Sequence, residues 1–180
     1  LVKIALLFQS KQGVGKNIFF ETLITVLLGK EYLLQTANMD HVIGKWSMIN
    51  NKIMVILDET SGKDSFQGSG KIKNLITSPF ITWEKKLKDP IEIRNFGRYL
   101  FFSNAETPIS IEVSDRRFCV FRCAEDFCGN TKYFDDMMTA FNYAPQQKAL
   151  YSFFKNRDIS KWNYLNRPIT DAYKDIQSVN

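Results

Sequence analysis

Histidine and cysteine are scarce in this 180-residue chain, and they are not arranged as a metal site. The one histidine, His41, lies far from the three cysteines, which all fall between Cys119 and Cys128. A zinc site on these thiols would lack a fourth ligand, so the cysteines are not expected to bind zinc. We expect reduced thiols in an intracellular protein.

Long apolar runs, internal repeats and low-complexity tracts are also missing. No apolar run approaches the roughly 18 residues that a membrane span needs, and nothing resembles a signal peptide. The hydrophobic fraction of 44% and the charged fraction of 24% are typical of a folded soluble protein. Because the chain opens at Leu1 directly on a strand-like run, we expect it to be a segment of a longer protein.

The net charge of +5 suits a polyanionic partner but does not require one, since many proteins without such a partner are mildly basic. The position of the charge is more informative than its total. Basic residues gather between two strand-like runs, at Lys85, Lys86 and Lys88. This pattern predicts a β-hairpin with a basic tip.

Short apolar runs alternate with helical patterns, which is typical of an α/β domain with a parallel sheet. From residue 131 onward the apolar residues are at helical spacing, which predicts a helical C-terminal subdomain (131–180) beside a core of residues 1–130. The expected strands cover residues 2–8, 32–36, 53–57, 98–103 and 118–121, with the hairpin at 80–83 and 91–93. The expected helices of the core cover residues 18–27, 39–48 and 71–77.

A glycine-bearing loop joins the first strand to the first helix. It reads Ser10-Lys11-Gln12-Gly13-Val14-Gly15-Lys16-Asn17, close to the phosphate-binding pattern G-x-x-x-x-G-K-[ST]. In that pattern backbone N–H groups cradle phosphates and the lysine reaches the β and γ oxygens. Ser10 and Asn17 depart from it, and Asn17 stands where a hydroxyl would hold Mg²⁺. The alternative is a plain strand–turn–helix connection. The predicted nucleotide-binding residues are Gln12, Gly13, Val14, Gly15, Lys16 and Asn17.

An acidic pair, Asp58-Glu59, follows the apolar run at residues 53–57. Carboxylates at the carboxyl end of a buried strand can hold a divalent ion and orient a water for phosphoryl transfer. We expect Asp58, with Asn17, near a Mg²⁺ ion and Glu59 toward the attacking water. The alternative is a solvated acidic turn after a core strand.

The order of five stretches resembles superfamily 3 helicases, above all the helicase domains of viral, phage and plasmid primase-helicases. These stretches are SKQGVGKN, IMVILDE, WEKKLKDPIEIRN, RYLFFSN and SDRRF, and they run from Ser10 to Phe118. The resemblance implies a three-layer P-loop fold of the AAA+ type with a hairpin insertion. It also implies ATP and Mg²⁺ as ligands, single-stranded DNA as partner, and a homo-oligomeric ring, a hexamer. The location would be a bacterial cytoplasm or, for a viral protein, the replication site in the host cell.

The resemblance also assigns roles to individual residues. Asn104 matches the sensor that contacts the γ-phosphate or the water, and Arg116 or Arg117 matches an arginine finger acting on a neighbouring subunit's nucleotide. The hairpin lysines would grip the DNA backbone, although Leu87 stands where the family usually has a small residue. Each has a simpler alternative: a turn cap for Asn104, an intrachain salt bridge for one arginine, and a solvated tip for the lysines.

Three functions therefore compete. The leading prediction is an ATP-dependent DNA helicase motor with Lys16, Asp58, Glu59 and Asn104 in one subunit and an arginine from the next. A small-molecule P-loop kinase would need an acceptor pocket, for which no motif is present. A non-catalytic nucleotide-binding module of replication or assembly is favoured by Asn17, because an amide is a poorer Mg²⁺ ligand than a hydroxyl.

Overall fold

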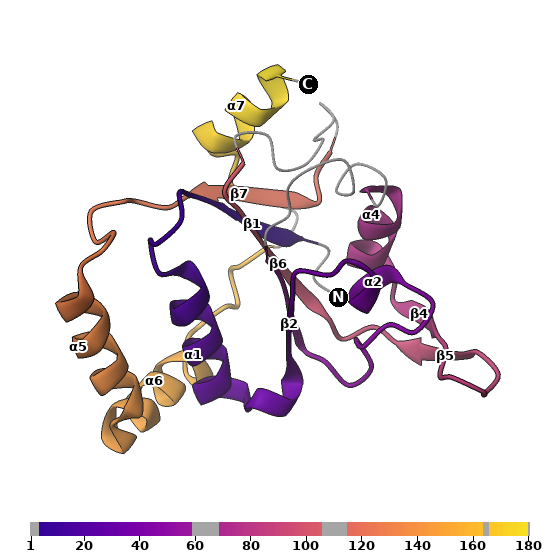
Figure 1. Ribbon diagram of the computed structural model, residues 1–180, viewed down its shortest axis with the longest axis horizontal. Coiled ribbons are helices and arrows are strands. Elements are labelled where there is room, and N and C mark those ends of the chain that lie inside the picture. The colour runs from indigo at the N-terminus through magenta and orange to yellow at the C-terminus, as the bar shows by residue number, and fades with distance from the viewer. Residues whose placement is uncertain (1–3, 59–68, 106–114, 164–165, 180) are drawn as a thin grey trace.

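The fold centres on a five-stranded, fully parallel sheet with the strand order β2-β3-β6-β1-β7 (Figure 1). The computed structural model describes residues 4–58, 69–105, 115–163 and 166–179. The sheet strands are β1 (Ala5–Gln9), β2 (Leu33–Thr36), β3 (Met54–Leu57), β6 (Arg98–Ser103) and β7 (Phe118–Arg122), and the separate hairpin consists of β4 (Phe80–Trp83) and β5 (Ile91–Arg94).

The predicted strands are confirmed to within a few residues at their ends, because their apolar runs are buried on both faces of the sheet. On one face, residues such as Leu7, Val55 and Phe101 belong to the larger core cluster. On the other face, Ile56 and Phe102 form a second cluster with Ile24 of the first helix. A strand with both faces covered needs no alternation of polar and apolar residues, so continuous apolar runs in the sequence could predict these strands.

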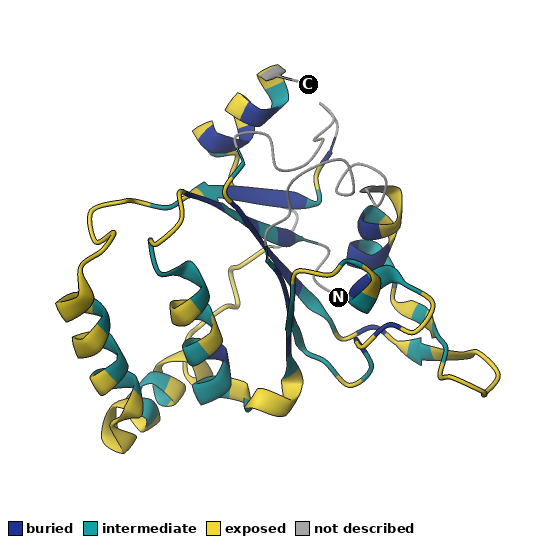
Figure 2. Ribbon diagram, viewed as in Figure 1, coloured by how far each residue is buried: buried dark blue, intermediate teal, exposed yellow. Residues whose placement is uncertain are grey.

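Helices cover both faces of the sheet (Figures 1 and 2). On one side lies α1, and α5 and α6 pack beside it; Phe19 and Phe141 meet edge to face at 6.0 Å. The other side carries α2, α4 and α7. The helices are α1 (Lys16–Leu28), the 3-10 turn η1 (Lys30–Tyr32), α2 (Asp40–Ile43), α4 (Ser69–Thr77), α5 (Thr131–Asn142), α6 (Ala144–Lys155) and α7 (Asp171–Val179).

The helix predicted over residues 39–48 is shorter in the structure, where α2 ends at Ile43. Gly44 takes an extended conformation after it, and the chain then turns back so that the Met48 N–H donates to the His41 carbonyl at 2.7 Å. This turn buries Ile49 in the core and leaves Trp46 and Met48 exposed. The apolar residues of the segment therefore do not share one helical face, and glycine ends the helix.

The helices after residue 130 lie in two different places. α5 and α6 pack on α1, whereas α7 packs beside β7, with Ala172, Tyr173 and Ile176 in the main core cluster. The segment is helical as predicted, and the domain boundary near residue 130 stays a prediction. Within the described part of the chain, no helix has both the length and the apolarity to cross a membrane.

Candidate functional site

The loop after β1 and the ends of β3 and β6 meet at one edge of the sheet, because these strands are neighbours and run parallel. The register pairs Gln9 of β1 with Ser103 of β6, and Leu57 of β3 with Phe101 of β6. Residues that follow these strands must therefore emerge close together. They line a cleft of about 540 Å³, whose described lining residues are Gln12, Gly13, Val14, Gly15, Lys16, Asn17, Ile18, Asp58, Asn104, Thr131, Phe134 and Asp135.

The glycines of the loop hold a backbone that other residues adopt at a cost. Gly13 and Gly15 both have φ +83°, in the left-handed region. A Cβ on Gly15 would lie 2.1 Å from the Phe134 ring, so the loop packs directly against α5. The close approach of Phe134 and the positive φ together explain why glycine precedes Lys16.

The first turn of α1 points its backbone N–H groups at the cleft without a competing partner from the described side chains. Its N-cap is Gly15, which has no side chain to accept these hydrogen bonds, and no acidic residue lies in the first turn. The first N–H groups of a helix have no intrahelical acceptor, and the helix dipole adds partial positive charge there. The helix end is therefore suited to an anion such as a phosphate.

Lys16 is held at the centre of the cleft by two polar side chains. Its Nζ donates to Ser10 Oγ at 3.0 Å and to Asn104 Oδ1 at 2.8 Å. Ser10, which departs from the sequence pattern, is buried and thus serves as a support for the lysine. Asn104 comes from a position 88 residues away, and its amide reaches the lysine as part of the same site.

Asp58 and Asn17 lie in contact beside Lys16, with Asn17 Nδ2 donating to Asp58 Oδ2. Asp58 directly follows β3, and its backbone N–H donates to the Thr36 carbonyl at 2.9 Å. A carboxylate and an amide oxygen are hard ligands, and Mg²⁺ usually takes one or two carboxylates together with waters and substrate phosphates. Asp58 is therefore of the ligand type that Mg²⁺ takes, whereas the amide group of Asn17 turns its nitrogen, not its oxygen, toward Asp58. Glu59 lies outside the described residues, and its role stays a prediction.

Cys123 lies close to this lysine, and burial raises the pKa of its thiol, although the Lys16 charge acts in the opposite direction. A thiol with a raised pKa stays protonated near neutral pH and is a poor nucleophile and metal ligand. Cys128 lies on the outer side of the loop, where its Sγ donates to the Gln12 carbonyl at 3.5 Å. Both cysteines pack against the loop of residues 10–15: Cys123 lies beside Val14 and Gly15, and Cys128 beside Gly13.

The predicted arginines do not line the cleft. Arg117 pairs with Asp115 of the same chain, Nη1 to Oδ1 at 3.8 Å, as the salt-bridge alternative anticipated for one of the two. Arg116 is exposed and makes no ion pair with any residue that the structure describes. Lys16 is the one basic residue among the described residues that line the cleft.

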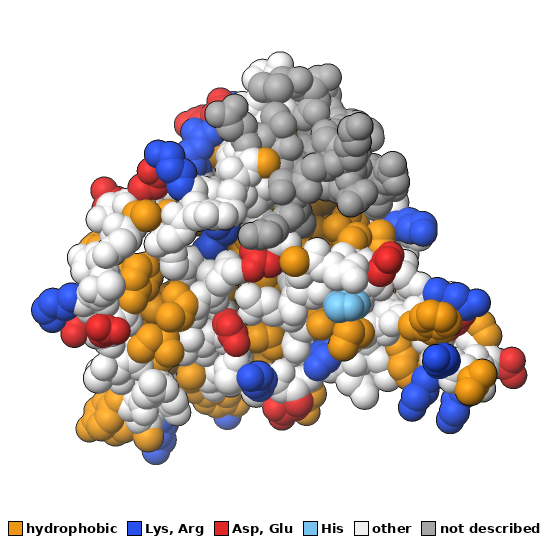
Figure 3. Space-filling view, in the orientation of Figure 1, with side chains coloured by type: hydrophobic (Ala, Val, Ile, Leu, Met, Phe, Trp, Pro, Cys, Tyr) orange, Lys and Arg blue, Asp and Glu red, His pale blue; other side chains and the backbone are white. Residues whose placement is uncertain are grey.

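The predicted hairpin is confirmed, and it projects from the body of the molecule with basic side chains gathered over it (Figures 1 and 3). Lys85, Lys86 and Lys88 are exposed at its tip. Leu87 is 97% exposed and has φ 63°, which explains why a small residue would be favoured there. At the end of β4, where the tip begins, Trp83 Nε1 donates to the Ser47 carbonyl at 2.9 Å, so this aromatic side chain contributes to packing.

Sequence patterns did not point to the part of the cleft that α5 supplies. Thr131, Phe134 and Asp135 line it from the start of that helix. Phe134 was visible only as one apolar residue at helical spacing, and Thr131 and Asp135 carry no motif. Gly15, directly before Lys16, was the only sign in the sequence that another segment packs closely against the loop.

Comparison with known proteins gives one family and one group of relatives. A family model described as a family of unknown function, DUF5906, matches residues 8–117. A DNA primase-polymerase of Nitratiruptor phage NrS-1 is 31% identical over 126 residues, which cover 67% of this chain and 17% of that protein. The chain therefore spans about one sixth of this relative, well under two thirds of its length.

Solved structures of the NrS-1 C-terminal region have the same fold. An apo structure of this region matches with a TM-score of 0.77 and 25% identity, over 99% of this chain and 43% of that one. A second apo structure, in the A form, gives a TM-score of 0.70 and 27% identity over 99% and 42% of the two chains. The α/β fold with a parallel sheet and a hairpin is thus shared with a region of a phage primase-polymerase.

Proposed function

The chain belongs to the DUF5906 family, and we propose that it is an ATP-hydrolysing motor of the superfamily 3 helicase type that moves along single-stranded DNA. The observation that carries the proposal is the contact of Lys16 with Asn104 in a cleft that also holds Asp58. A phosphate-loop lysine, a polar residue from an adjacent strand and an acidic strand end are the parts that phosphoryl transfer requires. The sheet order, with β1 between β6 and β7, fits an AAA+-type P-loop fold.

Each side chain of the cleft has a task in this proposal. The Lys16 ammonium, held by Ser10 and Asn104, would neutralise charge on the β- and γ-phosphates. Asn104 would contact the γ-phosphate or the attacking water, and Glu59 would orient that water. Asp58 and Asn17 would hold Mg²⁺, which when bound neutralises charge on the phosphate oxygens.

The absence of arginine from the described lining of the cleft supports a shared site. Transition-state charge in phosphoryl transfer is commonly stabilised by an arginine, which is supplied in trans in many such enzymes. Arg116 is exposed and does not line the cleft of its own subunit. In this proposal it reaches the cleft of a neighbouring subunit. We propose that the protein works as a homo-oligomeric ring, a hexamer, with the basic hairpins around the DNA.

The test is ATP hydrolysis by the intact protein with and without single-stranded DNA, alongside a mass measurement in ATP. We expect hydrolysis that DNA stimulates, an ATP-dependent assembly, and loss of hydrolysis in Lys16→Ala. The matched control is Lys30→Ala, because Lys30 is an exposed lysine beyond the other end of α1. Full hydrolysis by Lys16→Ala would refute the assignment of the site.

A non-catalytic nucleotide-binding module is the second candidate, and the contact of Asn17 with Asp58 favours it. An amide that is already hydrogen-bonded to the acidic residue is a weaker Mg²⁺ ligand than the usual hydroxyl. Nucleotide binding without hydrolysis, in the presence of DNA and Mg²⁺, would support this candidate. Phosphoryl transfer to a metabolite without any effect of DNA would instead indicate a kinase.

A further inference from the structure

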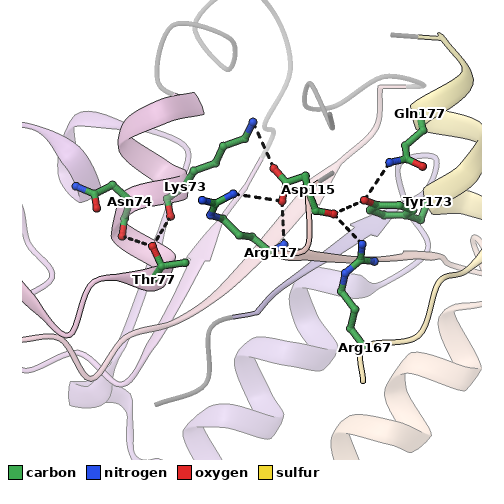
Figure 4. A network of polar contacts seen from close by, with 8 residues as sticks. All are labelled: Lys73, Asn74, Thr77, Asp115, Arg117, Arg167, Tyr173 and Gln177. Carbon is green, nitrogen blue, oxygen red and sulfur yellow. Dashed lines mark hydrogen bonds and ion pairs between the residues drawn. The ribbon is translucent and has the colours of Figure 1, made fainter. Parts of the chain in front are cut away.

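A buried carboxylate lies directly before the exposed Arg116. The Asp115 side chain is only 1% exposed, and its two oxygens face different partners (Figure 4). Oδ1 accepts the Arg117 N–H at 2.8 Å, and Oδ2 lies 3.3 Å from Lys73 Nζ of α4. The conformation of residues 115–117 is therefore set from within the protein.

The backbone of Asp115 is fixed from a second direction by the C-terminal part of the chain. Its carbonyl accepts hydrogen bonds from Arg167 Nη2 at 2.7 Å and from the buried Tyr173 hydroxyl of α7. The Arg167 guanidinium stacks over the Tyr173 ring, 4.2 Å from its centroid. Contacts from α4 on one side and α7 on the other thus meet at one residue (Figure 4).

A solvent-exposed turn would hold its shape with fewer contacts than the side chain and the carbonyl of Asp115 make. A buried carboxylate is stable only when it is paired, and removal of one partner leaves an uncompensated charge. The degree of burial also differs from one residue to the next: Asp115 is buried, Arg116 is exposed and Arg117 is half-buried. Fixing the residues on both sides of Arg116 restricts the direction in which its side chain leaves the surface.

We propose that Asp115 is a positioning residue for Arg116, which holds the arginine in the orientation that the neighbouring subunit's nucleotide requires. This inference rests on the proposed function, in which Arg116 acts in trans. A flexible arginine loses side-chain entropy when it is fixed on a phosphate, and a preset backbone reduces the number of conformations to be searched. The Asp115–Lys73 ion pair makes α4 part of that support.

The experiment uses mixed assemblies of the intact protein. Asp115→Asn removes the charge with little change of shape, and Lys73→Met removes the other half of the ion pair. Because misplacing a catalytic group by about 1 Å can cost about 100-fold in rate, we expect each variant to lower kcat by about tenfold to 100-fold. The matched control is Asp175→Asn, which removes an exposed carboxylate paired with Arg122 and should keep the full rate.

Mixing separates positioning from general damage. Asp115→Asn subunits keep their own cleft, so subunits with an intact Arg116 but a dead cleft, Lys16→Ala, should restore hydrolysis. Arg116→Ala subunits should not restore it, because neither partner then supplies a correctly placed arginine. Failure of the Lys16→Ala mixture to restore Asp115→Asn, when it does restore Arg116→Ala, would overturn the positioning role and leave the proposed function standing.

Other outcomes are equally decisive. If Asp115→Asn does not fold, Lys73→Met in the same mixtures decides, and an unchanged kcat in that variant overturns the inference. If Arg116→Ala hydrolyses ATP at the full rate, the assignment of Arg116 as the arginine that acts in trans is refuted, and the positioning role of Asp115 is refuted with it. The inference is supported if Asp115→Asn lowers the rate of ATP hydrolysis, and if mixing with Lys16→Ala subunits restores that rate while mixing with Arg116→Ala subunits does not.

Discussion

Replacing Lys86 and Lys88 together by alanine gives the sharpest test of the hairpin as a DNA contact. Both side chains are exposed and make no ion pair with any residue that the structure describes. The tip is closed by the Lys88 N–H, which donates to the Lys85 carbonyl at 3.0 Å, a contact that alanine keeps. We therefore expect the folded hairpin and its stability to change by less than about 0.5 kcal/mol, as for ordinary surface substitutions.

The expected loss of DNA affinity follows from counterion release. Each phosphate contact on a single strand contributes about 0.7 to the slope of log Kobs against log salt, so two lost contacts reduce the slope by about 1.4. Extrapolated from 1 M to about 0.1 M salt, this change corresponds to roughly 25-fold weaker binding per protomer. Basal ATP hydrolysis should be unchanged, because the tip does not line the cleft around Lys16.

The measurements are fluorescence titrations of single-stranded DNA at several salt concentrations, with ATP hydrolysis measured with and without DNA. The control variant carries Lys148→Ala with Lys155→Ala, which removes the same charge from exposed positions of α6. We expect the hairpin variant to lose DNA stimulation and the control to keep it. Unaltered affinity, salt slope and unwinding in the hairpin variant would show that DNA does not contact these lysines.

Two further predictions concern the buried core and the glycine-bearing loop before α1. Burial raises the pKa of Tyr99 to about 12 from 10.0; its contribution to stability is complete below pH 10 and is lost as pH rises toward 12. In Tyr99→Phe the free energy of unfolding should therefore fall less steeply across this range, by about 2 kcal/mol in total, in denaturant titrations at each pH. Gly15→Ala forces a non-glycine residue to φ +83° against the Phe134 ring. It should cost at least about 1–2 kcal/mol in thermal unfolding and abolish nucleotide binding, and adding Phe134→Ala should recover only part of the stability.

Part of the cleft at the sheet edge could be predicted from the sequence, because several of its residues follow buried strands. Asp58 and Asn104 each directly follow a strand, and Lys16 ends the loop after the first strand; parallel strands bring such positions to one edge. The prediction needed no knowledge of side-chain packing. It needed only that β3, β6 and β1 be neighbours, which the strand order shows.

The positions of α5 and α7 could not be predicted, because they depend on which surfaces of the folded chain pack together. Helical spacing identified apolar faces after residue 130, but it does not say that α7 lies beside β7 while α5 lies beside the glycine-bearing loop. The contacts of Phe134 with the cleft and of Tyr173 with Asp115 follow from these placements. A pattern within one element gives the face that is buried, and only the tertiary fold gives the partner.

The position of α4 joins the two ends of the proposed mechanism. Lys73 of this helix pairs with Asp115, and the carbonyl of Leu75, two residues on, accepts from the buried Asn95 Nδ2 at 2.7 Å. Asn95 directly follows β5, at the base of the hairpin. A movement of the hairpin that carries α4 would therefore move the support of Arg116, whereas a movement without α4 would break a buried hydrogen bond at a cost of about 1–3 kcal/mol. The hydrogen bond and the ion pair thus connect the base of the hairpin to the support of Arg116, and in the proposed mechanism they give DNA on the hairpin a route through α4 to the arginine.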